Sequence, residues 1–203
     1  FLAQGGMCTL KAESDYGCYF EDTLRAGHYE NDKTSVELMI RSSRNVVRDL
    51  VAYGVDFQRE EDGSFAYTRE GGHSEKRILF HKDVTGREIT SKLLTQVQKR
   101  QNITLLEHTE LLDIISRGNT CLGAVIRNPE GDLQTVSSSF TVLATGGIGG
   151  LFRHSTNFRH LTGDALAIAI RHRIALKNIN YIQIHPTTFY SPGNKDRSFL
   201  ISE

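Results

Sequence analysis

The segment Thr141–Gly150 constrains the fold of this chain more than any other stretch. Its first four residues are apolar or β-branched, which predicts the end of a buried strand. Four glycines in the last five positions allow left-handed backbone angles and let a ligand approach closely. The turn is then either a cradle for phosphates or an aromatic cofactor, or a plain strand-to-helix turn.

Composition argues against several classes of partner. The 203 residues include 24 basic and 24 acidic side chains, so no charge excess favours a nucleic acid or an anionic membrane. No apolar run approaches the roughly 20 residues that span a bilayer. Cys8, Cys18 and Cys121 form no CxxC pair and no even set, which predicts reduced thiols in a cytoplasmic protein. Both chain ends fall within patterned segments, so we expect a piece of a longer protein.

Two capping-box patterns predict helices. Thr34–Glu37 precedes apolar residues at helical spacing as far as Val51, and Gly54 marks the expected end. Thr85–Glu88 begins a second helix, whose apolar stripe we expect to pack on a sheet. Residues 19–26 are weakly helical.

The rest of the first 144 residues contains four strand patterns, with turn signals between the last three. This order of elements predicts an α/β fold with an α+β insertion. It runs from a helix and a strand to a three-strand meander, whose last strand ends in glycines. The four strand segments are 103–108, 111–115, 121–127 and 133–144.

Three further segments carry polar groups suited to a site. Arg69–Ser74 gathers charge, an imidazole and a hydroxyl around two glycines, as in a binding loop or a solvated surface loop. Asp164 opens a helix made of small residues, where it caps the helix or accepts from a sugar-like hydroxyl. Residues 178–185 alternate as a strand, so Gln183 and His185 share a face. With the Thr187 hydroxyl they suit recognition of a carboxylate or carbonyl, although a lone His beside an apolar run, such as His185, is more often a structural residue.

The order of these motifs resembles the flavoprotein family of L-aspartate oxidase and of the succinate dehydrogenase and fumarate reductase flavoprotein subunits. The resemblance runs nearly end to end, and the Arg69–Ser74 loop followed by Arg77 is similar to the L-aspartate oxidase branch in particular. The motifs are Ala3–Gly6, Arg69–Ser74, Asp83–Gly86, Leu143–Gly147, Thr162–Asp164 and Gln183–Thr187.

The resemblance implies FAD as cofactor, bound by a Rossmann-like domain of the fumarate reductase flavoprotein type. Residues 1–178 would be that domain, without its N-terminal GxGxxG strand, and 179–203 the start of a capping domain. It also implies cofactor contacts. Ala3, Gln4, Gly5 and Gly6 would lie against the flavin, Ala144, Thr145 and Gly146 along the phosphates and ribityl chain, Asp164 at the flavin end, and the Leu111 backbone at the adenine.

For the substrate, the resemblance implies oxidation of L-aspartate to iminoaspartate, with oxygen or fumarate as acceptor. This is the first step of de novo NAD biosynthesis and would place quinolinate synthase downstream. Gln183, His185 and Thr187 would hold carboxylates, Ser202 would keep a hydroxyl common in the family, and Glu70 would meet the α-amino group. No metal is implied, and the arginine proton acceptor lies outside residues 1–203, so we expect the chain alone to be inactive.

Two alternatives remain open. One is a soluble fumarate reductase or succinate dehydrogenase flavoprotein, which differs at Glu70 because succinate has no amine to pair with it. The other is a non-enzymatic flavin-binding or interaction fragment that keeps the fold without turnover.

Overall fold

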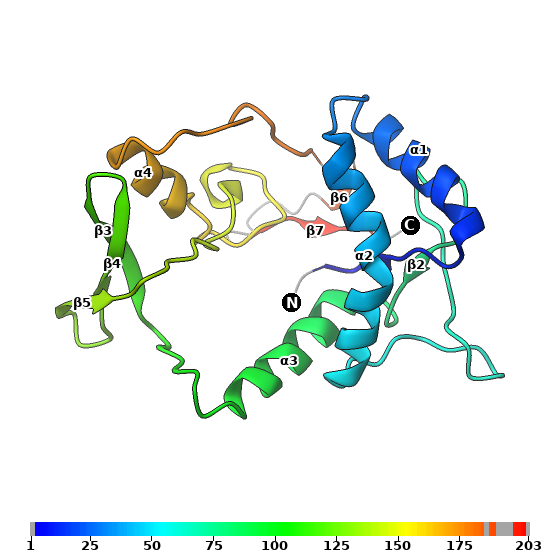
Figure 1. Cartoon of the computed structure of the whole chain (residues 1–203), viewed down its shortest axis with the longest axis horizontal. Helices are drawn as coiled ribbons and strands as arrows, with labels where there is room; N and C mark the ends of the chain where they lie inside the picture. Colours follow the sequence, from blue (N-terminus) through cyan, green and yellow to red (C-terminus); the bar gives the residue numbers. More distant parts are fainter. Residues whose placement is uncertain (1–2, 185–186, 190–196, 202–203) are drawn as a thin grey trace. The chain divides into compact units, whose positions relative to one another are not determined.

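The computed structural model describes residues 3–184, 187–189 and 197–201. The chain forms two compact units, Phe1–Leu105 and Leu106–Glu203 (Figure 1). Each unit has buried apolar side chains of its own, such as Ile40 and Phe57 in the first and Ile114 and Ile168 in the second.

Helices α1 (Tyr16–Ala26) and α2 (Lys33–Ala52) pack against each other in the first unit (Figure 1). Both helices were predicted. The cap of α2 differs from the prediction, because Asp32 and not Thr34 precedes the helix, and its carboxylate accepts a hydrogen bond from the Ser35 amide at 2.7 Å. The interface between the helices buries Leu10, Tyr19, Leu24, Val36 and Ile40.

A short antiparallel pair, β1 (Met7–Cys8) with β2 (Ile78–Leu79), lies beside this helical pair. Ile89 and Leu93 of helix α3 (Thr85–Gln98) pack against a core cluster that includes Leu79 of β2. The other buried members of this cluster lie outside the strands, so the expected packing of this helix on a sheet is met only in part. Apolar residues of α2 and α3 thus share one core with Leu79 of β2 and Met7 of β1.

The capping box predicted at the start of α3 is not formed. Val84 is the N-cap and makes no side-chain cap bond. Thr85 Oγ1 instead accepts from the His81 amide at 3.0 Å, and Glu88 Oε1 accepts from the Asp56 amide at 3.0 Å. Both side chains thus hold neighbouring loops, because those amides lie within reach once the chain is folded.

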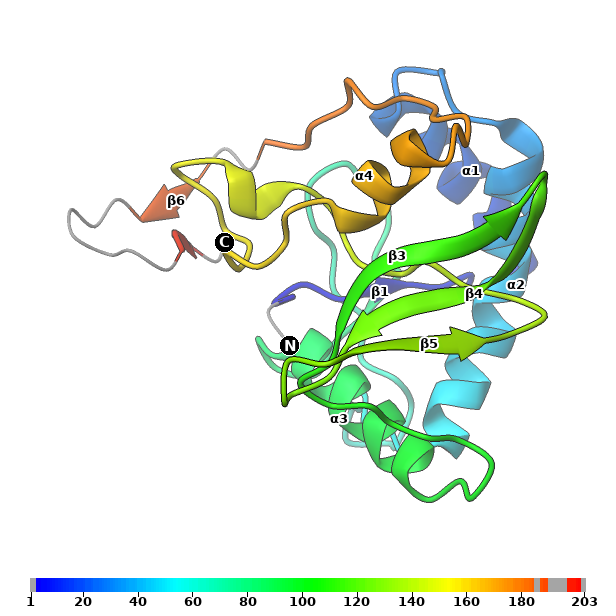
Figure 2. The same ribbon diagram turned by 90° about the vertical axis from the view of Figure 1, so that its left-hand side faces the viewer.

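The second unit contains the predicted meander, β3 (Glu110–Arg117), β4 (Thr120–Arg127) and β5 (Leu133–Ser137), in this antiparallel order (Figure 2). The turns lie where glycines predicted them, with Gly118 and Gly131 at positive φ. Helix α4 (Asp164–Arg171) packs on β3, and η2 (Gly149–Leu151) follows the glycine turn.

Three strand predictions are wrong in part or whole. Residues 103–108 form no strand, β5 ends at Ser137, and the described part of 178–185 is irregular. Val142, expected in a buried strand, is 87% exposed. A strand needs a neighbour that accepts its backbone hydrogen bonds. Among the described residues, no strand pairs with 103–108 or 178–184, and beyond β5 only the Ser138 amide still donates to β4, to the Leu122 carbonyl oxygen at 3.0 Å. Residues near the C-terminal end form a separate hairpin of β6 (Thr188–Phe189) and β7 (Phe199–Leu200).

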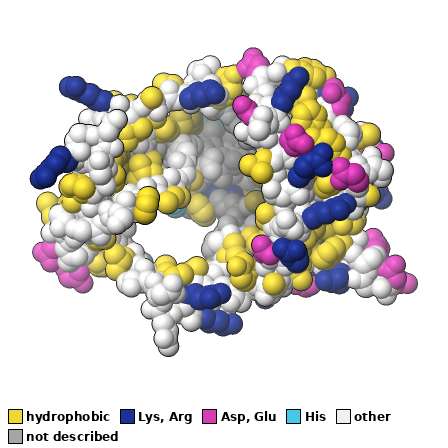
Figure 3. All heavy atoms as spheres, viewed as in Figure 1, with side chains coloured by type: hydrophobic (Ala, Val, Ile, Leu, Met, Phe, Trp, Pro, Cys, Tyr) yellow, Lys and Arg dark blue, Asp and Glu magenta, His cyan; other side chains and the backbone are white. Residues whose placement is uncertain are grey.

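Charged side chains are interspersed on the face drawn in Figure 3, where acidic, basic and hydrophobic groups alternate over α2. Arg41 and Glu37, for example, pair one helical turn apart at 2.8 Å. No helix of the described residues is long and apolar enough to cross a bilayer.

Candidate functional site

The N-terminal glycine segment and the Arg69–Ser74 loop meet in the first unit. A Cβ built on Gly5 would lie 3.0 Å from Glu70 Oε1 and 3.2 Å from Glu70 Oε2. The Glu70 carboxylate therefore lies directly over the Gly5 backbone, and a Cβ at this position would force the carboxylate to shift by a few tenths of an ångström. The structure thus brings together two elements that the sequence analysis singled out separately.

Gly6 is constrained from the other side of the segment. A Cβ there would lie 2.2 Å from the Leu79 carbonyl oxygen and 2.3 Å from Ile78 Cγ2. Ala3 is held by its carbonyl oxygen, which accepts a hydrogen bond from the Gly86 amide at 2.9 Å. The segment Ala3–Gly6, which includes Gln4, is thereby fixed flat against β2 and the start of α3, with Gly5 facing Glu70.

We call residues 69–77 the Glu70 loop. Its base is closed by a two-way backbone bridge, in which Thr68 and Ile78 exchange hydrogen bonds of 3.0 and 3.1 Å. Its tip is exposed at Glu70, Gly71 and Gly72, and Gly72 has a φ of +85°. The His73 amide donates to the Glu70 carbonyl oxygen at 3.3 Å, so the tip is a tight turn.

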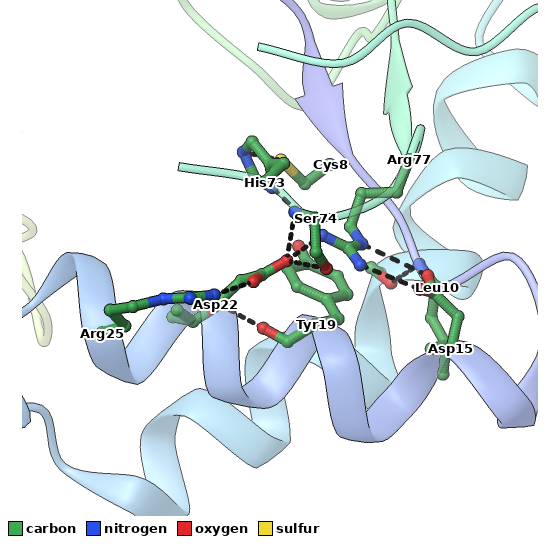
Figure 4. Close-up of polar contacts among 11 residues, drawn as sticks. Cys8, Leu10, Asp15, Tyr19, Asp22, Arg25, His73, Ser74 and Arg77 are labelled. Atoms are coloured by element: carbon green, nitrogen blue, oxygen red, sulfur yellow. Dashed lines mark hydrogen bonds and ion pairs between the residues drawn. The ribbon is translucent and has the colours of Figure 1, made fainter. Parts of the chain in front are cut away.

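Buried charges hold the far side of this loop (Figure 4). Arg77 is fully buried and donates to Asp22 Oδ2 at 2.7 Å and to Asp15 Oδ1 at 2.9 Å. Asp15 ends η1 (Glu13–Asp15) and Asp22 belongs to α1. The same Asp22 oxygen accepts from the Ser74 amide and the Ser74 hydroxyl, both at 2.7 Å. We call Asp15, Asp22, Ser74 and Arg77 the Arg77 cluster.

Electrostatics favour the charged forms of Asp22 and Arg77. Burial alone would raise the pKa of Asp22, but hydrogen bonds from Ser74 and Arg77 outweigh it and hold that pKa well below its usual value. Burial likewise would lower the pKa of Arg77, and its bonds to Asp15 and Asp22 raise it instead. Removing one partner from such a buried pair leaves the other charge uncompensated, at a cost of about 3–5 kcal/mol.

His73 is oriented by the same arginine. Its Nδ1 lies 3.3 Å from Arg77 Nη1 and its Nε2 lies 3.5 Å from Cys8 Sγ. A guanidinium can only donate, so Nδ1 is the acceptor in this contact. Burial raises the pKa of Cys8, which disfavours its thiolate form.

A pocket of about 470 Å³ opens on the α1 and α2 side of the Glu70 loop. Its apolar wall includes Met39 and Val46 of α2, and its polar groups include Asp22 and His73. The lining residues are Met7, Cys8, Tyr19, Asp22, Thr23, Ala26, Met39, Ser43, Val46, Gly71, Gly72 and His73.

In the second unit, the glycine turn is tied to the start of α4. The Ala165 amide donates to Thr145 Oγ1 at 3.2 Å, so Thr145 satisfies one of the first amides of the helix. Gly163 is the N-cap with a φ of +77°, and Asp164 accepts from Thr162 Oγ1 at 2.7 Å within the first turn. Asp164 is therefore not the N-cap, and its carboxylate lies on the exposed edge of the turn.

The backbone beside Thr145 is open. Ala144, Gly146 and Gly147 are exposed, and a Cβ built on Gly147 would meet nothing within 4 Å. Gly146 has a φ of +78°, which favours glycine. A flat or phosphate-bearing ligand could thus approach the amides of this turn closely.

Leu111 is half-buried in β3, close in sequence to a polar cluster that the sequence analysis missed. Asp113 Oδ1 lies 2.8 Å from His172 Nε2, and Asp113 Oδ2 lies 3.3 Å from Arg171 Nε. His172 Nδ1 also lies 2.8 Å from Ser116 Oγ. We call these residues the Asp113 latch. In the sequence, the only indication of the latch is a pair of basic residues at a helix C-terminus. Their partner Asp113 is more than fifty residues away, so the pattern could not identify it.

Partial burial would raise the pKa of Asp113, but the bonds from His172, the Ile114 amide and Arg171 outweigh it and lower that pKa. Arg171 Nη2 donates as well to the Leu112 carbonyl oxygen at 2.9 Å. The latch therefore connects the end of α4 to the strand that carries Leu111.

The remaining predicted site residues lie near the C-terminal end of the chain. Gln183 and Thr187 are exposed, and the Thr187 carbonyl oxygen accepts from the Ile201 amide at 3.5 Å. His185 and Ser202 lie outside the described residues. Within the described part of the chain, no group of three or more His, Cys, Asp or Glu side chains is arranged to hold a metal ion.

A family model for the FAD binding domain matches residues 1–203. Among curated proteins, the chain is 44% identical to the L-aspartate oxidases of Clostridium perfringens, over 202 residues, and Clostridium acetobutylicum, over 204 residues. These alignments cover 100% of this chain and 46% of each relative, so the chain spans about half the length of these relatives. They confirm the resemblance inferred from the order of the motifs.

Two solved structures are similar to the chain. The Mycobacterium smegmatis Sdh1 complex in the apo form matches with a TM-score of 0.88 and 31% identity, over 98% of this chain and 36% of that one. E. coli quinol fumarate reductase FrdA matches with a TM-score of 0.81 and 28% identity, over 84% of this chain and 29% of that one. The likeness confirms the mixed α/β fold class expected from the sequence.

Proposed function

Because the chain belongs to the FAD-binding domain family and has the fold of the fumarate reductase flavoproteins, we propose that it is part of an L-aspartate oxidase. The reaction would convert L-aspartate to iminoaspartate. Two observations support this proposal. The chain is 44% identical to an L-aspartate oxidase over its whole length, and the Glu70 carboxylate lies over Gly5.

The residues present fit FAD. The glycine turn offers an exposed backbone beside Gly147, where an added Cβ would meet no atom within 4 Å. Ala144, Thr145 and Gly146 would hold the phosphates and ribityl chain, and Asp164 a hydroxyl of the cofactor. Ala3, Gln4, Gly5 and Gly6 would hold the flavin, and the Leu111 backbone the adenine. When bound, FAD supplies the acceptor for two electrons and the hydrogen from the substrate carbon.

The observation that carries the choice of substrate is the Glu70 carboxylate over Gly5. An acidic side chain beside the segment that would hold the flavin can accept charge-assisted hydrogen bonds from a substrate ammonium. It would orient Cα of an amino acid toward the cofactor. A substrate with carboxylates alone would place like charge beside Glu70, which disfavours it.

The two substrate carboxylates need donors of their own. We assign these to the amide of Gln183, the imidazole of His185 and the hydroxyls of Thr187 and Ser202. Residues 179–203, which carry all four, would begin a capping domain that follows an FAD-binding domain formed by 1–178.

A dehydrogenase or fumarate reductase flavoprotein is the competing function, because the solved structures similar to the chain carry those names. The two functions differ in whether the substrate bears an amine, so Glu70 discriminates between them.

The test is anaerobic bleaching of the flavin in the full-length protein, with L-aspartate or succinate as reductant. We expect bleaching by aspartate alone. Glu70→Gln should raise the KM for aspartate by about tenfold or more, as expected for a lost charge-assisted bond, with unchanged FAD content.

Glu75→Gln is the matched control, because Glu75 is an exposed acid on the same loop. It should leave the KM for aspartate unchanged. Bleaching by succinate alone would assign the protein to the dehydrogenase branch, and loss of flavin from the Glu70 variant would make the loop structural.

The proposal extends to the cellular role. Iminoaspartate formed with oxygen or fumarate as acceptor would feed de novo NAD biosynthesis, with quinolinate synthase as the next enzyme. The three cysteines, Cys8, Cys18 and Cys121, are free, as suits the reducing cytoplasm that we propose as its location.

A further inference from the structure

We propose that Asp22 is a positioning residue for Glu70 and thereby sets the preference for an amino-acid substrate over a plain dicarboxylate. The proposal rests on the proposed function for the role of Glu70 itself. It concerns how a carboxylate at an exposed loop tip is held over Gly5.

The tip of the Glu70 loop has little packing to hold it. Glu70, Gly71 and Gly72 are exposed, and side chains built on the two glycines would meet nothing within 4 Å. The Thr68–Ile78 bridge fixes only the base of the loop. A second attachment is therefore needed to give Glu70 one position.

Asp22 supplies this attachment from α1 (Figure 4). Its Oδ2 accepts from both donors of Ser74 and from Arg77, each at 2.7 Å, and its Oδ1 accepts from Arg25. The Asp22 side chain is only 3% exposed and its bond to Arg77 is buried, so this bond constrains the geometry strongly. The bonds from Ser74 are partly buried.

The position of Ser74 is transmitted to Glu70 through one turn. The His73 amide donates to the Glu70 carbonyl oxygen, and His73 itself contacts Arg77 through Nδ1. Any shift of Ser74 away from Asp22 would therefore move His73 and the carboxylate over Gly5. In this proposal Asp22 acts on Glu70 only through the loop.

The experiment compares the KM for aspartate with the inhibition constant of succinate in the full-length, FAD-saturated protein. Asp22→Asn keeps the volume of the side chain and removes its charge. We expect the KM for aspartate to rise about tenfold, as for a lost charged hydrogen bond, and the inhibition constant of succinate to stay within about twofold.

Ser74 variants provide a graded series. Ser74→Ala removes one of the three 2.7 Å bonds and should give an intermediate rise in the KM, whereas Ser74→Thr retains a hydroxyl and should restore the wild-type ratio. Asp49→Asn is the control, because Asp49 is an exposed acid on α2. It should change neither constant.

A double-mutant cycle with Glu70→Gln separates positioning from general destabilisation. If Asp22 acts through Glu70, the double variant should be no less selective than Glu70→Gln alone. Limited proteolysis of the FAD-free protein gives a readout that does not depend on turnover, and Asp22→Asn should speed cleavage near Gly71–Gly72.

The outcomes distinguish the two proposals. A wild-type protein that oxidises succinate and not aspartate overturns the proposed function. The positioning role of Asp22 is overturned if the wild-type protein prefers aspartate and Asp22→Asn leaves the ratio of the KM for aspartate to the inhibition constant of succinate unchanged. A variant in which both constants rise by the same factor is one such case.

Discussion

At the scale of single residues, the ionisation of Asp22 couples the Arg77 cluster to pH. Its pKa is lowered in the folded protein, because the bonds from Ser74 and Arg77 outweigh the effect of burial. Such a carboxylate stabilises the fold fully above its unfolded pKa of about 3.9, and this contribution is lost as the pH falls through the folded pKa.

We therefore expect Asp22→Asn to lower the stability of the protein by about 3–5 kcal/mol at pH 7, where the wild-type pair is intact. The difference between wild type and variant should persist down to about pH 4 and shrink below it. Thermal unfolding of both proteins between pH 3 and pH 7 measures this. A difference that stayed constant down to pH 3 would show that the charge of Asp22 is not what stabilises the cluster.

At the scale of elements, the Asp113 latch fixes α4 against β3. The start of α4 lies beside Thr145 and Asp164, and β3 carries Leu111, so the latch sets the distance between segments that would hold the two ends of FAD. We expect Asp113→Asn to weaken FAD binding by about three- to tenfold, which is less than the full effect of a charged hydrogen bond because the Asp113 side chain is 35% exposed. Flavin fluorescence during titration of the FAD-free protein measures the change.

Glu110→Gln is the matched control for the latch. Glu110 lies on the same strand and pairs with Arg127, but both side chains are about half exposed, so the pair contributes little. The affinity for FAD should be unchanged in this variant. Equal effects of the two substitutions would mean that α4 and β3 are positioned by other contacts.

At the scale of the whole molecule, the chain belongs to the FAD-binding domain family, so FAD should stabilise it. A ligand that binds the folded state and not the unfolded state shifts the equilibrium toward folding by mass action. We expect the melting temperature of the full-length protein to rise with FAD concentration, with a gain of about 2.7 kcal/mol at a hundred times the Kd. FMN lacks the adenylate that the Leu111 backbone would meet, so it should stabilise far less. Equal stabilisation by FMN would contradict adenine recognition in the second unit.

Local patterns predicted much of this fold. Helices α1, α2 and α3 follow from apolar spacing and stop signals such as Gly54, and the meander follows from turns at Gly118 and 128–132. These elements need only neighbours in sequence to be specified. The order of the motifs also predicted the family. The glycines and polar groups in these motifs are local features of the backbone that a cofactor can approach closely.

Other features depend on contacts distant in sequence. Side chains that can cap a helix, such as Thr85 and Glu88, instead bind amides that folding brings near. The segment that ends at Ala144 has an apolar pattern, yet it forms no strand where the described residues offer no partner. Pattern alone cannot reveal these outcomes, because hydrogen-bond partners are decided by the fold.

The sequence by itself determined the helices, the meander, the glycine-rich segments and the identity of Glu70 as the candidate residue for an amine. Only the tertiary structure decided that Glu70 lies over Gly5 and that Asp22 and Arg77 hold its loop. The physical reason is that a buried charge must find its partners in space, and Asp22 and Arg77 are 55 residues apart in the chain.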